Sequence, residues 1–164
     1  MKKVLVISCL LAMAFSAFAA GNLKADDCAV GEAKNNATIK GDFRYYIEKK
    51  IVVSDKSASP IKDGDKVYKK RIETKGITDG IVFTAKKGDV VTVVATSGSK
   101  TDSRTITVRP FDKQTKKIGS ITVPAWNGDS PKLASGTVTI PADGEYIVRG
   151  SSGGGMYIFE IDIK

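Results

Sequence analysis

An isolated tryptophan stands out among the side chains that could do chemistry. Trp126 is the only tryptophan of the chain and lies in the segment Pro124-Ala125-Trp126-Asn127-Gly128-Asp129, which is typical of a loop. An exposed aromatic plane beside Asn and Asp suits stacking on a sugar ring and hydrogen bonding to its hydroxyl groups. The alternative is a loop residue that folds back to cap the core. The sequence leaves both interpretations of Trp126 open.

Two arginines pose a related choice. Arg104 shares the face of an expected strand with Ile106, where an apolar residue would be usual. A charged side chain on such a face needs a partner or a place at the sheet edge. Arg104 therefore forms either a structural ion pair, with Glu73 or Asp102, or a fork onto a carboxylate or hydroxyl pair of a ligand. We favour the structural role for Arg104, and Arg71 poses the same choice.

A glycine run followed by an alternating segment adds further candidates. Tyr157, Phe159, Ile161 and Ile163 alternate with polar neighbours that include Glu160, which predicts one half-buried strand face and one solvated face. Glycines before a strand allow a tight turn or a surface that a ligand can approach closely. The complete set of candidate ligand-binding residues is Trp126, Arg71, Arg104, Gly153, Gly154, Gly155 and Tyr157.

Several kinds of catalytic and cofactor site are missing from the sequence. The chain has no histidine, which removes Ser-His-Asp triads, Cys-His dyads, His-zinc sites and imidazole acid–base catalysis. It has no phosphate loop, dinucleotide fingerprint or EF-hand loop. Asp63-Gly64-Asp65 lacks the rest of a calcium ligand set and predicts a turn. We expect no catalytic residues, no metal ligands and no cofactor, and hence a protein that is not an enzyme.

The first 19 residues have the order of a secretory signal. Lys2 and Lys3 precede an apolar stretch and the small-residue site Ala17-Phe18-Ala19. The apolar stretch is shorter than the roughly 20 residues that a membrane-spanning helix needs. The sequence therefore predicts a secreted or periplasmic protein with no membrane span. Cys28 would then be the only cysteine of the mature chain, either an inert thiol or a route to an intermolecular bridge.

The formal net charge of the whole chain is +8, and many basic residues occur as scattered doublets. Such doublets usually solvate turns and protect sheet edges. The functional alternative is affinity for polyanions such as uronic-acid polysaccharides. Nucleic acid is not expected as a partner, because the protein is predicted to be exported and has no nucleic-acid motif.

Alternating apolar patterns place nearly all of the mature chain in strands. Residues 20–42 lack sustained periodicity and predict a flexible leader with at most one short helical turn. A single domain is expected over 43–164, with strands near 43–47, 51–53, 67–73, 80–85, 89–96, 103–111, 117–123, 136–140, 145–150 and 155–163. Short turns separate these strands and no helix-length amphipathic segment occurs. The fold class predicted is all-β, an antiparallel β-sandwich of jelly-roll type.

An ordered set of motifs resembles a known kind of domain. The set comprises Val67-Tyr68-Lys69-Lys70-Arg71, Gly80-Ile81-Val82-Phe83-Thr84, Gly88-Asp89-Val90-Val91-Thr92-Val93, Asp102-Ser103-Arg104-Thr105-Ile106-Thr107-Val108, Ile140-Pro141-Ala142-Asp143-Gly144-Glu145-Tyr146-Ile147 and Gly153-Gly154-Gly155-Met156-Tyr157-Ile158. In this order it resembles the jelly-roll carbohydrate-binding accessory domains of secreted bacterial pectate lyases. The resemblance covers roughly 45–164 and implies a two-sheet sandwich that binds carbohydrate. It assigns no ligand contact to any single residue.

Two functions follow as expectations. The first is an exported, non-catalytic module that recognises a polysaccharide, with acidic glycans favoured by the positive charge. The second is an exported structural or adhesive subunit that binds no sugar and self-associates through sheet edges or Cys28.

Overall fold

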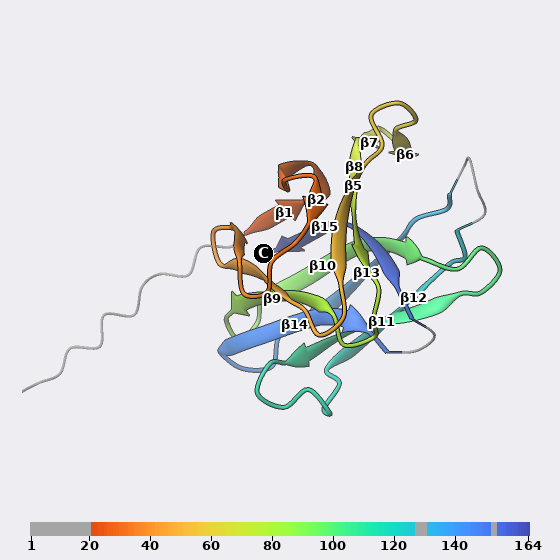
Figure 1. Ribbon diagram of the computed structural model, residues 1–164. Helices are drawn as coiled ribbons and strands as arrows, with labels where there is room; N and C mark the ends of the chain where they lie inside the picture. Colours follow the sequence, from red (N-terminus) through yellow and green to blue (C-terminus); the bar gives the residue numbers. More distant parts are fainter. Residues whose placement is uncertain (1–20, 127–130, 152–153) are drawn as a thin grey trace, which may run out of the picture.

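Two antiparallel sheets face each other across one hydrophobic core in the computed structural model, which describes residues 21–126, 131–151 and 154–164 (Figure 1). The predicted fold class, an antiparallel β-sandwich of jelly-roll type, is confirmed. Among the described residues no helix is long and apolar enough to cross a membrane.

The larger sheet has seven strands with the C-terminal strand near its centre. In order across the sheet it contains β13 (Ala134–Thr139), β10 (Val90–Ser97), β15 (Met156–Ile163), β8 (Lys70–Thr74), β5 (Ile51–Asp55) and β2 (Gly31–Glu32). The seventh strand, β1 (Asn22–Lys24), pairs with the end of β15 that β8 leaves free. β15 is therefore hydrogen-bonded along both of its edges.

The second sheet has six strands and lies beneath the first in Figure 1. Its order is β12 (Gly119–Val123), β11 (Arg104–Pro110), β14 (Gly144–Gly150), β9 (Gly80–Ala85), β4 (Phe43–Tyr46) and β3 (Thr38–Lys40). A separate hairpin, β6 (Ile61–Asp63) and β7 (Lys66–Tyr68), turns at Gly64, whose φ of 58° favours glycine. This hairpin is the turn predicted for Asp63-Gly64-Asp65.

A register shift in β15 changes which of its side chains face the core. Opposite β10, Glu160 pairs with Val94 but Ile158 already pairs with Ala95, so one extra residue bulges from β15. Met156, Ile158, Ile161 and Ile163 enter the core, whereas Tyr157 and Phe159 join a cluster on the outer face. The prediction of one shared face for Tyr157, Phe159, Ile161 and Ile163 is wrong, because the bulge breaks the two-residue period.

Glu160 lies on the outer face of β15, but the β6–β7 hairpin buries it there, whereas we expected a solvated side chain. Its carboxylate accepts hydrogen bonds from the Tyr68 hydroxyl at 2.8 Å, from Lys66 Nζ at 2.8 Å and from Asn22 Nδ2 at 2.9 Å. Burial raises the pKa of Glu160, but these donors lower it by more, so the net shift is downward. Glu160 thus joins β15 to the hairpin and to β1.

The segment before Phe43 is not the flexible leader that its composition predicts. Over residues 21–42 it contributes β1, a 3-10 turn η1 (Ala25–Asp27), β2 and β3, and it buries Leu23, Ala25 and Cys28 in the core. Strands of two or three residues are too short to show a period, and the partners of β1 and β2 lie far away in the sequence. The predicted signal, residues 1–19, lies outside the described residues.

A buried carboxylate holds the loop before β5 against the turn before β9. Asp79 is 0% exposed, and its two oxygens accept four backbone N–H groups, of Glu48 and Lys49 at 2.8 Å, Lys50 at 3.0 Å and Gly76 at 2.8 Å. Burial raises the pKa of Asp79, but the four donors lower it by more. The Asp79 carboxylate therefore takes the place of backbone carbonyls as the hydrogen-bond acceptor for the N–H groups of two chain segments.

Replacing Asp79 with Asn tests this carboxylate. The amide keeps one acceptor oxygen and turns its NH2 group toward backbone donors, so we expect a loss of about 2–4 kcal/mol in the free energy of unfolding. Urea unfolding followed by circular dichroism at pH 7 measures the loss. The matched control is Asp55→Asn at the exposed end of β5, where the carboxylate accepts one N–H, from Ser57. Equal stability of the two variants would contradict the role assigned to Asp79.

A candidate ligand-binding pocket on the outer face of the seven-stranded sheet

An apolar cluster covers part of the outer face of the seven-stranded sheet. Ile61 and Tyr68 of the β6–β7 hairpin pack there against Val94 and Phe159, and the rings of Tyr68 and Phe159 are 5.3 Å apart. Trp126, Leu133 and Tyr157 border this cluster and are only partly buried. The hairpin thus covers one part of the face, and the aromatic residues beside it stay accessible.

Arg71 lies against two aromatic rings at this border. Its guanidinium carbon is 3.8 Å from the centre of the Tyr157 ring and 4.8 Å from that of Trp126. The two rings meet edge to face, with centroids 5.2 Å apart. The backbone N–H of Trp126 donates to the Ser99 carbonyl at 2.7 Å, which anchors the start of its loop. Cation–π and aromatic contacts therefore hold these three side chains as one rigid unit.

Glu73 fixes the orientation of Arg71. Its Oε1 accepts from both Nε and Nη2 of Arg71 at 2.8 Å, and Ser54 donates to the same oxygen. Lys75 Nζ binds the other carboxylate oxygen at 2.7 Å. Burial raises the pKa of Glu73, but these donors outweigh burial and lower the pKa to about 2. The carboxylate is ionised at neutral pH, so Arg71 is both oriented and neutralised.

These residues line a pocket of about 520 Å³, which we call the aromatic pocket. Its lining residues are Lys56, Ser59, Ile61, Arg71, Gly98, Lys100, Trp126, Pro131 and Tyr157. None of these lining residues is Asp or Glu, so they offer no carboxylate pair for acid–base catalysis. Among the described residues no group of three metal-ligating side chains occurs. The aromatic pocket offers ring surface, hydroxyl and ammonium groups, which suit reversible binding.

The aromatic pocket unites three of the predicted candidates, Arg71, Trp126 and Tyr157. Trp126 matches neither of its two sequence interpretations completely, since it packs on the outer cluster and still lines the pocket. Sequence reasoning missed Lys56, Ser59 and Lys100, which reach the pocket from separate loops and carry no motif. Of the other lining residues, Gly98 lies in Ser97-Gly98-Ser99, a segment whose composition is typical of a turn.

Arg104, Gly154 and Gly155 lie beside the aromatic pocket without lining it. Arg104 Nη1 donates to the carbonyl of Gly155 at 2.5 Å, and the N–H of Gly98 donates to the same oxygen at 3.0 Å. The ion pair proposed for Arg104 is wrong, because Glu73 binds Arg71 and Asp102 accepts a hydrogen bond from Ser99.

The glycine run serves chain packing where it is described. A Cβ on Gly155 would collide with the carbonyl oxygen of Thr74, and Gly154 has a φ of 104°. The third predicted glycine, Gly153, lies outside the described residues. Gly154 and Gly155 thus allow the turn into β15 to pass close to the end of β8.

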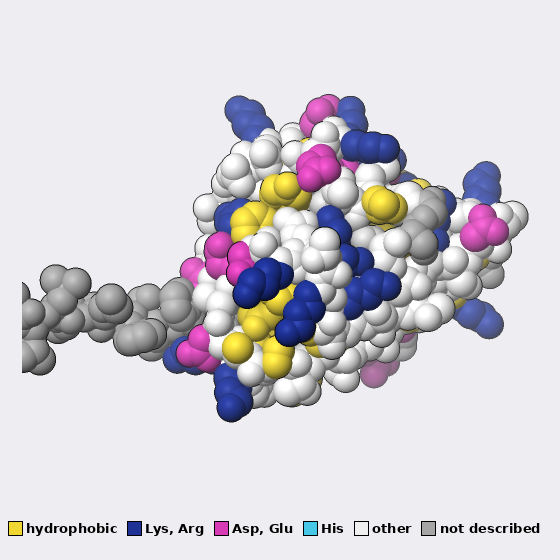
Figure 2. All heavy atoms as spheres, turned by 90° about the horizontal axis from the view of Figure 1, so that it is seen from below, with side chains coloured by type: hydrophobic (Ala, Val, Ile, Leu, Met, Phe, Trp, Pro, Cys, Tyr) yellow, Lys and Arg dark blue, Asp and Glu magenta, His cyan; other side chains and the backbone are white. Residues whose placement is uncertain are grey.

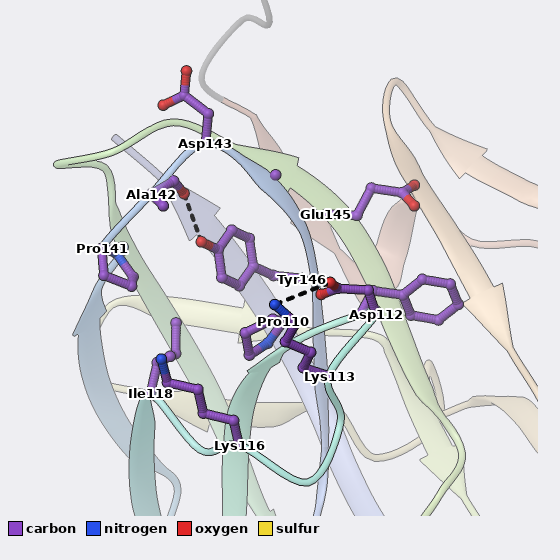
Figure 3. A pocket seen from close by; sticks show the side chains of 12 residues that line it. Pro110, Asp112, Lys113, Lys116, Ile118, Pro141, Ala142, Asp143, Glu145 and Tyr146 are labelled. Carbon is purple, nitrogen blue, oxygen red and sulfur yellow. Dashed lines mark hydrogen bonds and ion pairs between the residues drawn. The ribbon is translucent and has the colours of Figure 1, made fainter.

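A second hollow of about 430 Å³ lies beside the ends of β11 and β14 (Figure 3). Tyr146 lies at its centre, and its hydroxyl already donates to the carbonyl of Ala142 at 2.5 Å. Figure 3 shows the carboxylates of Asp143 and Glu145 pointing away from the Tyr146 ring. This hollow is lined by charged side chains of both signs, and the Tyr146 hydroxyl at its centre already donates its hydrogen bond to Ala142. None of the predicted site residues lines the hollow.

Acidification tests the Glu73 pair. The folded-state pKa of about 2 is below the ordinary value of 4.5, so the ionised carboxylate stabilises the fold above pH 4.5, and this stabilisation disappears as the pH falls toward 2. We expect the stability difference between the wild type and Glu73→Gln to shrink by about 2–3 kcal/mol over this range. Urea unfolding at several pH values measures it. A difference that does not change with pH would contradict the pairing.

Arg104→Ala tests the corrected role of that residue. No buried carboxylate loses its partner, and the Gly155 carbonyl keeps the Gly98 N–H, so we expect a loss of about 1–2 kcal/mol in the free energy of unfolding. Thermal and urea unfolding measure it. A loss above about 3 kcal/mol, the amount typical of a broken buried ion pair, would show that Arg104 has a charged partner.

Comparison with known proteins shows the fold. No family model and no curated protein matches the sequence. The K2 cleaved adhesin domain of Lys-gingipain matches the structure with a TM-score of 0.59 and 9% identity, over 89% of this chain and 99% of that one. The K1 cleaved adhesin domain of Lys-gingipain from Porphyromonas gingivalis W83 gives 0.57 and 10%, over 89% and 98%.

A carbohydrate-binding module is also among the similar structures. CsCBM6-3 from Clostridium stercorarium, solved in complex with cellobiose, gives a TM-score of 0.49 and 16% identity, over 88% of this chain and 92% of that one. The resemblance to accessory domains of pectate lyases stays a prediction. The structure of this chain is a β-sandwich of the kind found in the gingipain adhesin domains.

Proposed function

We propose that this protein is a secreted or periplasmic, non-catalytic module that binds a polysaccharide in the aromatic pocket. The observation that carries the proposal is the convergence of Arg71, Trp126 and Tyr157 on one pocket, whose described lining residues include no carboxylate. These side chains come from three distant parts of the chain and contact one another, and Glu73 fixes the orientation of Arg71. A rigid aromatic surface limits the entropy lost on binding.

The chemistry of the aromatic pocket matches a sugar. The apolar face of a pyranose ring packs on aromatic rings, while its hydroxyl groups need donors and acceptors around the edge. Trp126 and Tyr157 offer ring surface, and Ser59, Lys56 and Lys100 supply polar groups. The volume of about 520 Å³ falls in the usual range for small-ligand sites.

The charges around the aromatic pocket favour an acidic sugar. Arg71 is neutralised by Glu73, but Lys56 and Lys100 have no carboxylate within 4 Å among the described residues. Their ammonium groups would attract a uronic-acid carboxylate, and the formal net charge of +8 acts in the same direction. Binding should therefore weaken as the salt concentration rises.

Trp126→Ala tests the polysaccharide proposal. Removing a central aromatic contact should weaken binding by roughly thirtyfold or more, in line with the loss at a hot-spot residue. Titration calorimetry with oligogalacturonate and with a neutral cello-oligosaccharide of equal length measures affinity and charge preference. Lys62→Ala, an exposed change on the hairpin outside the pocket, is the matched control and should bind like the wild type.

Two results would overturn the proposal. One is the absence of binding to either oligosaccharide by the wild type at high protein concentration. The other is unchanged affinity of a folded Trp126→Ala variant. Stronger binding of the neutral sugar would remove the acidic preference and leave the carbohydrate proposal standing.

The fold of the gingipain adhesin domains favours a second candidate, an adhesive or assembly subunit that binds no sugar. The edge strands β2, β3, β12 and β13 are where another chain could pair. Cys28 does not suit a bridge between chains, because it is buried and burial raises the pKa of its thiol. Light scattering coupled to size exclusion distinguishes the two, since assembly predicts oligomers that form without sugar and persist in reductant.

A further inference from the structure

Two arginines lie side by side on the outer face of the six-stranded sheet, far from the aromatic pocket. Arg109 of β11 alternates with the core residues Ile106 and Val108, so it faces outward. Arg149 of β14 is paired with Thr107, its neighbour on the same face. Figure 2 views this face from below Figure 1 and shows Lys and Arg side chains gathered around a small hydrophobic area. We call Arg109 and Arg149 the arginine pair.

One neutral residue supplies most of the acceptors for the arginine pair. The backbone carbonyl of Gln114, in the β11–β12 loop, accepts from Arg109 Nη1 at 2.5 Å and from Arg149 Nη2 at 3.4 Å. The side-chain oxygen of Gln114 accepts from Arg149 Nη1 at 2.9 Å, and Thr107 accepts from Arg109 Nε at 2.9 Å. Because the two guanidinium groups share one carbonyl oxygen, two positive charges are held close together.

No described carboxylate binds the arginine pair directly. Neither arginine forms an ion pair with a described carboxylate, and Glu145, on the same sheet, binds Arg44 at 3.0 Å. Burial lowers the pKa of Arg109, and the charge of Arg149 lowers it further. Like charges in a partly buried site repel each other, and a bound anion would remove that repulsion.

One edge of Arg149 is also short of hydrogen bonds. Its Nε is buried and has no acceptor among the described residues, and Nη2 on the same edge has only the 3.4 Å contact. Nε and Nη2 form the fork that grips a carboxylate, sulfate or phosphate oxygen pair. The Gln114 side chain accepts from Nη1, and at the fork itself only the Gln114 backbone carbonyl makes the weak contact with Nη2, so an anion at the fork competes with that carbonyl.

We propose that the arginine pair is an oxyanion-binding site, in which a carboxylate or sulfate group of a glycan replaces Gln114 as the acceptor. The site lies on the opposite sheet from the aromatic pocket and does not depend on it. A charged acceptor makes stronger hydrogen bonds than the neutral amide of Gln114. An oxyanion also satisfies Arg149 Nε and screens the two guanidinium charges from each other.

Arginine side-chain NMR tests the site on the intact protein. Titrating the wild type with sodium sulfate at constant ionic strength, balanced with sodium chloride, should shift the Nε–H signals of Arg149 and Arg109 saturably. The Nε–H signal of Arg71, whose guanidinium is already bound by Glu73, is the internal control and should not move. Absence of a saturable shift at Arg149 would overturn the proposal.

Substitutions of Gln114 and Arg149 predict opposite changes. Gln114→Ala removes the side-chain oxygen that competes for Arg149 Nη1, while the backbone carbonyl stays, and should tighten sulfate binding roughly two- to tenfold. Gln114→Glu supplies an internal carboxylate and should raise the melting temperature while abolishing the response to sulfate. Arg149→Lys keeps the charge but loses the fork and should weaken binding about tenfold or more. A Gln114→Glu variant that responds to sulfate like the wild type would overturn the proposal.

Three oligosaccharides show whether the oxyanion that binds is a glycan carboxylate or a glycan sulfate ester. Oligogalacturonate carries carboxylates, sulfated dextran oligosaccharide carries sulfate esters, and dextran oligosaccharide carries neither. We expect one or both charged ligands, and not dextran, to shift the Arg149 signal. Trp126→Ala should leave these shifts unchanged, which separates failure of this site from failure of the aromatic pocket. Shifts caused by inorganic sulfate but by neither charged glycan would overturn the glycan part of the proposal.

Discussion

The bulge in β15 is the constraint on which the outer surface of the seven-stranded sheet depends. Without the extra residue, Phe159 would follow Ile161 toward the core, and the hairpin β6–β7 would lose the largest apolar side chain that it covers on β15. Burying a side chain such as Phe159 contributes roughly 2–3 kcal/mol, enough to offset the disruption of one ladder position. Because β15 is bonded on both edges, the bulge has no free edge along which to relax.

The bulge also explains why buried carboxylates and the aromatic pocket occur together. It turns Tyr157 outward toward Arg71, onto the same face on which Glu160 binds Tyr68 and Lys66 of the hairpin. Glu73, on the neighbouring strand, then orients Arg71 against the ring. A buried ion pair of this kind adds little net stability, but it holds one arrangement of side chains. Here that arrangement is the wall of a pocket.

The arginines on the outer faces of the two sheets differ in their hydrogen-bond acceptors, which are charged on one sheet and neutral on the other. On the seven-stranded sheet, the positive charge of Arg71 is balanced by the Glu73 carboxylate, with which it forms an ion pair. On the six-stranded sheet, Arg109 and Arg149 share neutral acceptors and repel each other. An arginine that is paired with a carboxylate stabilises the fold and shapes a pocket. Two arginines without a carboxylate partner can still bind an external anion.

The sequence by itself determined the fold class, most strands and the turn at Gly64, because alternation and turn residues are local properties. It also identified Arg71, Trp126 and Tyr157, whose residue types suit binding wherever they lie. Tertiary structure alone decided the strands of residues 21–42, the partner of Arg104 and the lysines around the aromatic pocket. These features depend on pairing between distant segments and on one extra residue in β15. No local pattern records them, because a bulge shifts every later side chain to the other face while leaving the sequence period unchanged.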